Sequence, residues 1–414
     1  MSVYKSEFLR VLAARGFIHQ VSEAEALDAL AQSSAITGYI GFDCTAPSLH
    51  VGSLVQIMML YWMQQTGHRP IALMGGGTTR VGDPSGKDES RRLLDEAIIA
   101  RNLRSIRAVF RKFLKFRRSP ADALMVNNAG WLNKLKYIDF LREVGRHFSV
   151  NRMLSLESVK LRLDRQQELS FLEFNYMILQ AYDFVELYRR HGCVLQMGGS
   201  DQWGNIVNGI ELGRRMLNVR LFALTSPLIT TSSGEKMGKT AVGAIWLDPT
   251  MTSSYDYWQY WRNTADVDVE RFLKLFTVLP LDEISSLLDQ GINKAKVKFA
   301  TAATAMVHGK AAAKIAEKTA RIVFEEGGLA TTLPKVEISS MDVQEGLSVT
   351  NAFVRAGLVV SNSEARRYIK NRGLRVNDTL VTDERSMISI GDFGPHGIAK
   401  LSLGRKRHVL LKLA

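Results

Sequence analysis

Short apolar runs alternate with longer amphipathic stretches between about residues 35 and 231 of the chain. Five of these runs are short enough for strands and are mostly punctuated by Gly or Asp: AITGYIGFD, RPIALMGGG, DALMVNNA, CVLQMGGSD and LFALTSPLI. Strands that alternate with helices build a mostly parallel sheet whose two faces are both covered by helices. The pattern therefore predicts an α/β fold for this part of the chain.

Polar, glycine-rich segments follow three of the predicted strands. They are GFDCTAPS (41–48), GGGTTRVGDPSGK (75–87) and GGSDQWGN (198–205). In an open parallel sheet, ligands bind beyond the carboxyl ends of the strands, where such loops meet. The sequence therefore predicts a binding site at that edge of the sheet.

The pattern changes after residue 231. A polar loop with glycines, TSSGEKMGKTAVG (231–243), precedes a helical pattern that runs from about residue 253 to 324. The stretch that follows contains Gly and Pro and shows little periodicity, which is typical of a linker. We therefore expect four segments: an α/β domain (1–230), a mobile lysine-bearing loop with an α-helical domain (231–325), a linker (326–346) and a small α+β module (347–414).

Composition narrows the class of protein. Hydrophobic residues make up 46% of the 414 positions, which is enough to build large cores and argues against disorder. No stretch approaches the roughly 18 uncharged apolar residues of a membrane span, and the N-terminus lacks the features of a signal peptide. The two cysteines, Cys44 and Cys193, are far apart and not in a metal-binding spacing, which favours a reducing cytoplasm and argues against structural zinc.

The chain is basic, with 54 Lys and Arg against 41 Asp and Glu and a net charge of +13. A basic excess favours an anionic partner, nucleic acid above all, although it can also serve solubility alone. More than half of the excess lies in residues 347–414, which contain twelve Lys or Arg and five Asp or Glu. This segment has no strip of aromatic residues for stacking bases, so we expect it to contact the backbone and shape of an RNA.

Two separated segments have the chemistry of a phosphate site. In TAPSLHVGSL, the Pro-Ser pair at 47–48 is typical of a helix start, and free N–H groups at a helix N-terminus bind phosphate. His50 would add a hydrogen bond, and Gly52, which lacks a Cβ, would let a flat base lie on the backbone. In GEKMGKT, Lys236 and Lys239 would neutralise phosphate charge from a glycine-bearing loop. Taken separately, the two segments are also consistent with a capped helix bearing a surface His and with a solvated basic loop.

Taken together, the two segments resemble the paired signatures of class I aminoacyl-tRNA synthetases. Five ordered motifs resemble the bacterial type of tyrosyl-tRNA synthetase more specifically: YIGFDCTAPSLHVG, GDPSGK, FNYMILQAYDF, GGSDQWGNI and KMGKT. Two positions depart from the pattern, since Ser53 stands where a second His is usual and Ile40 where some relatives have Cys. The resemblance implies a Rossmann-like catalytic domain with a parallel sheet, then an anticodon-side helical domain. It also implies that the C-terminal unit is an RNA-binding module similar to one in a small-subunit ribosomal protein.

The resemblance implies a reaction in two steps, in which tyrosine and ATP form tyrosyl-adenylate and pyrophosphate before tyrosine is transferred to its tRNA. The attacking carboxylate is already ionised, so catalysis would rest on positioning and on stabilising phosphoryl charge, with Mg²⁺ accompanying the ATP phosphates. By resemblance, the groups on the phosphates or the departing pyrophosphate are Thr45, His50, Lys87, Arg91, Lys236, Lys239 and Thr240. The nucleotide-binding set is Gly41, Asp43, His50, Gly52 (under the adenine), Gly199, Asp201 (on the ribose) and Lys239.

The tyrosine pocket is expected on the helix FNYMILQAYDF. Tyr176, Gln180 and Asp183 lie four and three residues apart on one helical face among apolar neighbours, which indicates a buried polar pocket rather than a solvated face. The resemblance implies that Tyr176, Gln180 and Asp83 hold the substrate ammonium, whereas Asp183 and Tyr39 bind the phenol hydroxyl. Two further residues would orient the pocket and the substrate carboxylate, Gln196 and Gln202.

The remaining expectations concern partners. The resemblance implies a cytoplasmic homodimer with tyrosine tRNA, L-tyrosine and ATP as substrates and no membrane. One alternative is a tryptophanyl-type synthetase, which shares the catalytic fold; the paired hydroxyl ligands and the basic module argue against it. Another is a synthetase-like RNA-binding protein without catalysis, against which the intact His50, Lys236 and Lys239 argue.

Overall fold

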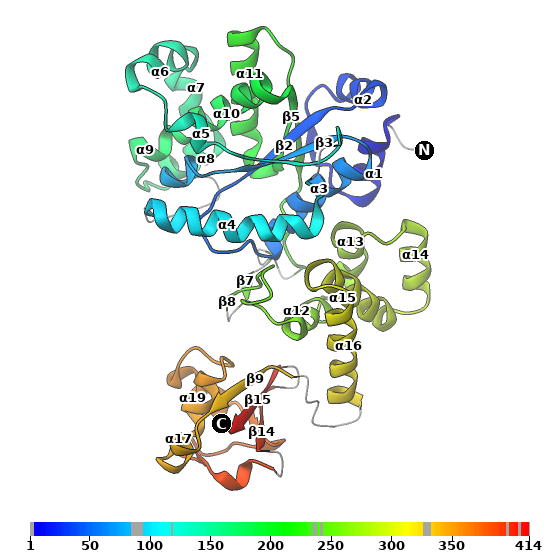
Figure 1. The fold of residues 1–414 in the computed structure, drawn as a ribbon, viewed down its shortest axis with the longest axis vertical. Coiled ribbons are helices and arrows are strands. Elements are labelled where there is room, and N and C mark those ends of the chain that lie inside the picture. Colours follow the sequence, from blue (N-terminus) through cyan, green and yellow to red (C-terminus); the bar gives the residue numbers. More distant parts are fainter. Residues whose placement is uncertain are drawn as a thin grey trace. The chain divides into compact units, whose positions relative to one another are not determined.

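The chain folds into two compact units, one formed by Met1–Met237 with Glu270–Leu281 and the other by Gly238–Val269 with Asp282–Ala414 (Figure 1). The computed structural model describes residues 4–83, 94–116, 119–232, 234, 237, 239–240, 243–325, 333–394, 397–404 and 407–413. Within helices and strands, the side chains at 157–158, 239–240 and 323–325 lie outside the described part as well.

A six-stranded sheet forms the centre of the first unit, with the strand order β1-β6-β5-β2-β3-β4. The antiparallel edge strand β1 pairs with β6, and all other neighbours pair in parallel. The order reverses between β2 and β5, which is where a Rossmann-like fold binds its ligands. The strands are β1 (Gln20–Val21), β2 (Thr37–Phe42), β3 (Arg69–Met74), β4 (Leu124–Asn127), β5 (Cys193–Gly199) and β6 (Phe222–Ser226).

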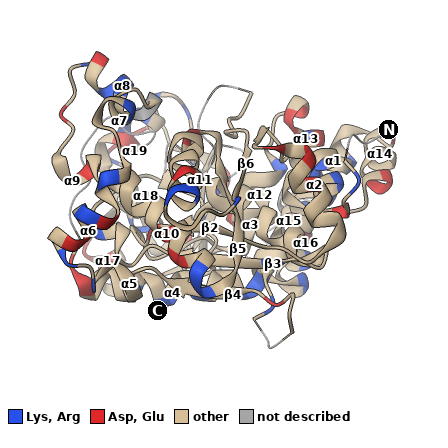
Figure 2. Ribbon diagram, turned by 90° about the horizontal axis from the view of Figure 1, so that it is seen from above, with Lys and Arg blue, Asp and Glu red and all other residues tan. Residues whose placement is uncertain are grey.

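The five predicted strands and the α/β class are therefore confirmed. The short β1 was not predicted, because two residues carry no periodicity. Apart from Arg69 in β3, the parallel strands contain no charged residue, as expected for strands covered on both faces. Charged residues occur instead on many of the helices, where the ribbon in Figure 2 is coloured blue or red.

Helices pack on this sheet, with α3 against β3, α10 against β5 and α11 against β6. On α3, consecutive residues Ile57, Met58, Met59 and Leu60 are all fully buried, which explains its continuous apolar sequence. The helices are α1 (Glu7–Arg15), α2 (Ala24–Ser33), α3 (Leu54–Gln65), α4 (Glu96–Phe113), α5 (Ala129–Leu132), α6 (Tyr137–Glu143), α7 (Val150–Leu154), α8 (Glu157–Asp164), α9 (Phe171–Phe174), α10 (Tyr176–His191) and α11 (Trp203–Leu217).

The helical pattern after residue 253 is confirmed as a run of five helices. An aromatic core that includes Tyr257, Trp261 and Phe299 joins α12 to α15, and α16 packs against both. The elements are β7 (Lys239–Thr240), β8 (Gly243–Ala244), α12 (Ser254–Arg262), α13 (Asp266–Phe276), α14 (Leu281–Asp289), α15 (Ile292–His308) and α16 (Lys310–Glu325). From Glu270 onward, α13 belongs to the first unit.

The C-terminal residues form a mixed α+β arrangement with a five-stranded sheet in the order β12-β11-β14-β15-β9. Its strands are β9 (Lys335–Ile338), β11 (Leu374–Val376), β12 (Thr379–Leu380), β14 (Ile398–Leu403) and β15 (Arg407–Leu413). A separate pair is formed by β10 (Leu347–Ser348) and β13 (Met387–Ile388). The helices are α17 (Ser340–Gln344), α18 (Val349–Arg355) and α19 (Asn362–Lys370).

The linker expected at 326–346 needs a correction. Residues 335–338 form β9 and residues 340–344 form α17, so nine residues of this range are regular structure. The strand was missed because it is stabilised by parallel pairing with β15, more than 70 residues further along the chain. No helix within the described ranges is long and apolar enough to cross a membrane.

Candidate active site

The loops after β2 and β3 meet at one edge of the first unit's sheet, as the sequence predicts, and the turn after β4, which was not predicted, joins them. Thr78 donates to Asp43 Oδ1 at 2.9 Å, which joins the loops after β3 and β2. The Gly77 N–H donates to Asn128 Oδ1 at 2.7 Å, which joins the loops after β3 and β4. A Cβ at Gly75 would collide with the Asp43 carboxylate, so this close approach requires glycine.

A buried carboxylate lies in this region on α10. Asp183 is 2% exposed and accepts hydrogen bonds from Asn128 Nδ2 at 2.9 Å and Trp131 Nε1 at 2.7 Å. Burial raises the pKa of Asp183 to about 7, although the two donors oppose the shift. The group is thus held in a fixed orientation and can accept a further hydrogen bond.

Tyr39, on β2, supplies a second polar group to the same pocket. The side chain is 1% exposed, and its hydroxyl has no hydrogen-bond partner among the described residues. Burial, and secondarily the nearby Asp183, raise the pKa of the phenol well above its usual value. Because buried hydroxyls nearly always have partners, this hydroxyl is suited to a polar ligand atom.

A chain of amides connects α10 with the loops after β3 and β5. Asn205 donates to Gln180 Oε1 at 3.1 Å, Gln180 donates to Gln202 Oε1 at 3.2 Å, and Gln202 donates to Asp83 Oδ2 at 3.0 Å. The chain therefore ends on a carboxylate, as a binding site for an ammonium group requires. Three residues predicted to serve the substrate amine and carboxylate, Asp83, Gln180 and Gln202, are brought together.

Two other predicted pocket residues, Tyr176 and Gln196, lie on α10 and β5. The Tyr176 hydroxyl donates to Asp43 Oδ2 at 3.2 Å, so the side chain links α10 to the loop after β2. Gln196 on β5 is 2% exposed, and its Oε1 has no hydrogen-bond partner among the described residues. Tyr176, Gln180 and Asp183 thus share one face of α10, as their spacing predicts.

The turn that contains His50 differs from its prediction. Regular helix begins with the 3₁₀ turn η1 (Val51–Ser53) and continues as α3, whereas the Pro-Ser pair at 47–48 precedes it. Ser48 is buried and donates to the Leu49 carbonyl, so it does not cap the helix. His50 occupies the capping position, because its Nδ1 accepts from the Gly52 N–H at 3.0 Å.

Gly52 is required by close packing. A Cβ at this position would lie 2.6 Å from His50 Cε1 and 2.8 Å from the Met237 carbonyl oxygen. The described part of the lysine motif therefore lies directly against the His50 turn. The two signature segments, almost 190 residues apart, come together in the first unit. A base could lie on Gly52 only if the Met237 carbonyl moves aside.

Most of the remaining predicted residues are either exposed or outside the described part of the chain. Thr45, Asp201 and Gly41 are exposed at the ends of β2 and β5, and a Cβ at Gly199 would lie 2.5 Å from Asp201 Oδ1. Lys87, Arg91 and Lys236 lie outside the described residues, as do the side chains of Lys239 and Thr240, whose backbone forms β7.

Residues 31–325 match the family model of the class I tRNA synthetases (W and Y). The chain belongs to this family. Among its curated relatives, the tyrosine–tRNA ligase of Methylocella silvestris is 64% identical over 412 residues, which cover 99% of this chain and 98% of the relative. The tyrosine–tRNA ligase of Rhodopseudomonas palustris is 61% identical over 418 residues and all of both chains.

Solved structures of class I synthetases share the fold. A C-terminally truncated mitochondrial tyrosyl-tRNA synthetase of Aspergillus nidulans is 31% identical, with a TM-score of 0.70 over 77% of this chain and 95% of that one. A tryptophanyl-tRNA synthetase of Encephalitozoon cuniculi is 12% identical, with a TM-score of 0.54 over 74% of this chain and 87% of that one. The latter likeness concerns the fold alone.

Three residues that the sequence does not predict also shape this site: Asn128, Trp131 and Asn205. Asn128 is 1% exposed and also donates to Thr78 Oγ1 at 3.1 Å, so it orders the loops after β3 and β4 as well as Asp183. Trp131 and Asn205 complete the two networks. The Asn-Asn pair near the end of the third predicted strand was the available signal, because polar residues at that edge of the sheet face the site.

Proposed function

We propose that the protein is a tyrosine–tRNA ligase, which uses ATP to convert L-tyrosine to tyrosyl-adenylate and pyrophosphate and then transfers tyrosine to tyrosine tRNA. Full-length relatives with this name at 64% and 61% identity support the assignment. The structural observation that carries it is the buried pair of Tyr39 and Asp183, which offers a phenol hydroxyl both a donor and an acceptor.

We infer that the amino acid lies between the two polar networks. Its phenol O–H would donate to Asp183, held by Asn128 and Trp131, and would accept from Tyr39. Its ammonium would be bound by Asp83, Gln180 and Tyr176, with Gln196 and Gln202 orienting the pocket and the carboxylate. An analogue without the hydroxyl would leave buried polar groups unpaired, which is the basis of strong discrimination.

The activation step needs no general base. The tyrosine carboxylate attacks the α-phosphorus of ATP, the bond to the pyrophosphate oxygen breaks, and pyrophosphate leaves. His50 and Thr45 would stabilise the phosphates, and Asp201 would accept from the ribose hydroxyls. The departing pyrophosphate would be held by the remaining predicted groups, Lys87, Arg91, Lys236, Lys239 and Thr240.

Mg²⁺ would be bound chiefly by the phosphates of ATP. In the described part of the chain, no group of three or more His, Cys, Asp or Glu residues has the arrangement of a metal site. Mg²⁺ commonly keeps several waters and binds substrate phosphates with few protein ligands. A metal that enters together with the nucleotide therefore needs no such group. When bound, it would neutralise phosphate charge.

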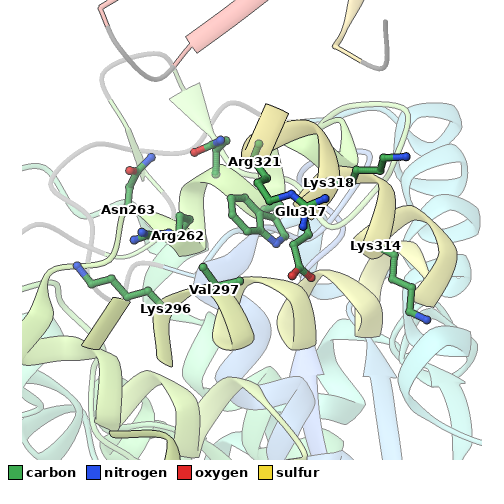
Figure 3. A pocket seen from close by; sticks show the side chains of 11 residues that line it. Arg262, Asn263, Lys296, Val297, Lys314, Glu317, Lys318 and Arg321 are labelled. Atoms are coloured by element: carbon green, nitrogen blue, oxygen red, sulfur yellow. The ribbon is translucent and has the colours of Figure 1, made fainter. Parts of the chain in front are cut away.

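A basic cavity in the helical part of the second unit supports the interaction with tRNA. The cavity, of about 810 Å³, lies between α12, α15 and α16 (Figure 3). Its lining includes Trp258, Glu317 and five cationic side chains, Arg262, Lys296, Lys314, Lys318 and Arg321. On α19, basic residues 366, 367 and 370 add positive charge, which suits a phosphate backbone.

A homodimer is supported by apolar residues on the surface of the first unit. Tyr137, Ile138, Val150 and Phe171 are each at least 60% exposed, and all come from the segment α6–α9. Concentrated exposure of large apolar side chains marks a protein interface more often than a free surface. We propose that this segment pairs with a second copy, and that the protein acts in the cytoplasm with its tRNA.

One assay tests the function against both alternatives. Exchange of labelled pyrophosphate into ATP should depend on tyrosine and not on tryptophan. Dependence on tryptophan would indicate the tryptophanyl alternative, and no exchange with either amino acid would indicate an RNA-binding protein without catalysis. Charging of tyrosine tRNA by the same preparation would test the second step.

A further inference from the structure

The helix α13 connects the two signature segments of the site. Its residues from Glu270 belong to the first unit, and Phe272, Leu273 and Phe276 are buried there. Two arginines make hydrogen bonds to backbone carbonyls here. Arg15 binds carbonyls at the C-terminal end of α13, and Arg271, on α13, binds a carbonyl at the base of the lysine motif. Neither arginine was among the residues predicted for the site.

Arg15 binds the C-terminal end of α13. Its Nη1 donates to the carbonyls of Lys274 at 3.0 Å and Thr277 at 3.1 Å, and its Nη2 donates to the Leu279 carbonyl at 2.7 Å. The last carbonyls of a helix have no partners within the helix, and a cation at this end also complements the helix dipole. Arg15 is 6% exposed, so these bonds are shielded from water.

The same guanidinium connects α13 with α3. It lies 4.1 Å from the centre of the Trp62 ring, a stacking contact that suits a planar cation. Trp62 is on α3, and α3 directly follows the His50 turn. Burial lowers the pKa of Arg15 to about 10, which leaves the group charged at neutral pH. Arg15 thus fixes the end of α13 to the helix that follows the His50 turn.

Arg271 connects α13 with the lysine motif. Its Nη2 donates to the Thr230 carbonyl at 2.7 Å, at the start of the polar loop. The neighbouring Ile229 carbonyl accepts from the Met237 N–H at 3.3 Å, which closes the base of that loop. The Met237 carbonyl in turn lies against Gly52.

We propose that Arg15 and Arg271 are positioning residues that hold the base of the lysine motif at a fixed distance from the His50 turn, with α13 as their common support. They would act on the ATP phosphates through these two segments without touching substrate. The inference rests on the proposed phosphate roles of the two segments.

The first test uses Arg271, which is exposed and whose loss should leave the fold intact. Arg271→Ala should lower the rate of tyrosyl-adenylate formation or raise the KM for ATP about tenfold, as expected for one lost charged hydrogen bond. The equilibrium Kd for tyrosine should change less than twofold. Arg271→Lys should restore most of the activity, because an ammonium can donate to the same carbonyl.

Two further variants distinguish this positioning role from a general loss of stability. Arg215→Ala removes another exposed arginine, which donates to the His147 carbonyl at 2.9 Å, and should leave both ATP and tyrosine parameters unchanged. Arg15→Lys keeps the charge but loses the forked guanidinium that binds several carbonyls at once. The variant should raise the KM for ATP, or lower the rate of adenylate formation, more than it raises the Kd for tyrosine. This difference should remain even if the melting temperature falls.

Three outcomes would overturn the proposal: unchanged ATP parameters in Arg271→Ala, equal losses for ATP and tyrosine in both arginine variants, or no recovery in Arg271→Lys. Lys239→Ala distinguishes a failure of this inference from a failure of the proposed function. If Lys239→Ala slows adenylate formation and Arg271→Ala does not, the lysine motif acts on phosphate but is not positioned by Arg271. If neither does, the phosphate role itself fails.

Discussion

The proposed site has a phenol end, with Tyr39 and Asp183, and a phosphate end, with Thr45, His50 and Asp201. The two ends differ in how far their side chains are exposed to solvent. At the phenol end, Asp183, Asn128 and Tyr39 are at most 2% exposed, with Tyr39 on β2, Asp183 on α10 and Asn128 in the short turn between β4 and α5. At the phosphate end, Thr45 and Asp201 are exposed, and the cations expected from the sequence lie in polar, glycine-rich segments, with their side chains outside the described residues. Buried groups in fixed positions discriminate between side chains. Exposed groups on loops can approach a charge that develops during the reaction.

The comparison predicts that damage at the phenol end changes which amino acid is bound, whereas damage at the phosphate end changes the rate. The buried networks are coupled through shared residues, since Asn128 contacts Asp183, Thr78 and the Gly77 N–H. Substitution of Asp183, which accepts two of these hydrogen bonds, should therefore cost more than the loss of one, because both donors are left unpaired.

The largest effect is expected for Asp183→Asn. The substituted amide would present N–H groups to the donors of Asn128 or Trp131, and it would lose the charge that accepts from the phenol. We expect kcat/KM for tyrosine in pyrophosphate exchange to fall about 10³-fold, as for other broken buried charge contacts. Asp28→Asn is the control, because this buried carboxylate also accepts two hydrogen bonds but lies on α2. A fall in the control as large as in Asp183→Asn would mean that the loss is one of folding.

At the phosphate end, Lys239→Ala should lower the rate of adenylate formation about 10²-fold, as does removal of one group that stabilises a transition-state charge. The Kd for tyrosine should stay within twofold, since the interaction matures only in the transition state. Rapid-quench measurement of tyrosyl-adenylate gives the rate, with Lys298→Ala as an exposed lysine control. If Lys239→Ala weakened tyrosine binding and left the rate of adenylate formation unchanged, the two ends of the site would not have the separate roles proposed here.

Tyr39→Phe should relax selectivity by about tenfold, the worth of one buried hydrogen bond to the substrate. The ratio of kcat/KM for tyrosine to that for phenylalanine is the measured quantity. Tyr257→Phe, which alters another fully buried tyrosine, should leave this ratio unchanged. If the ratio is the same in Tyr39→Phe and the unaltered protein, Tyr39 does not bind the phenol.

Local patterns explain what could be predicted from the sequence. The five strands of the parallel sheet have short apolar patterns of their own, and the face of α10 follows from the spacing of Tyr176, Gln180 and Asp183. The resemblance to tyrosyl-tRNA synthetases, carried by five ordered motifs, is confirmed by the family match and the full-length relatives. The individual roles of the site residues stay predictions.

Contacts between distant segments explain what could not be predicted. Asn128 and Trp131 reach Asp183 across more than 50 positions, and no local pattern marks such a pair. The same holds for β9, which is stabilised by β15 and was assigned to a linker. The helix start was placed at the Pro-Ser pair because those residues are typical caps, whereas the structure uses the His50 side chain.

The smallest effect is expected in the pH dependence of Asn128→Ala. Burial raises the pKa of Asp183 to about 7, and the hydrogen bond from Asn128 opposes this shift. Loss of the Asn128 side chain should therefore raise the pKa of Asp183 further. The phenol donates to the ionised carboxylate, so tyrosine affinity should be lost as the pH falls through this pKa. In the variant this loss should begin about one pH unit higher, with little change in Kd at pH 8.5.

The measurement is the Kd for tyrosine between pH 5.5 and 8.5 in the unaltered protein and the variant. Asn102→Ala is the matched control, because Asn102 is also buried and donates to the Cys44 carbonyl rather than to Asp183. A midpoint that does not move in Asn128→Ala would show that Asn128 only packs beside Asp183. Affinity that is lost as the pH rises, rather than as it falls, would mean that the protonated carboxyl is the form that binds tyrosine, and the donor and acceptor at the phenol end would then be exchanged.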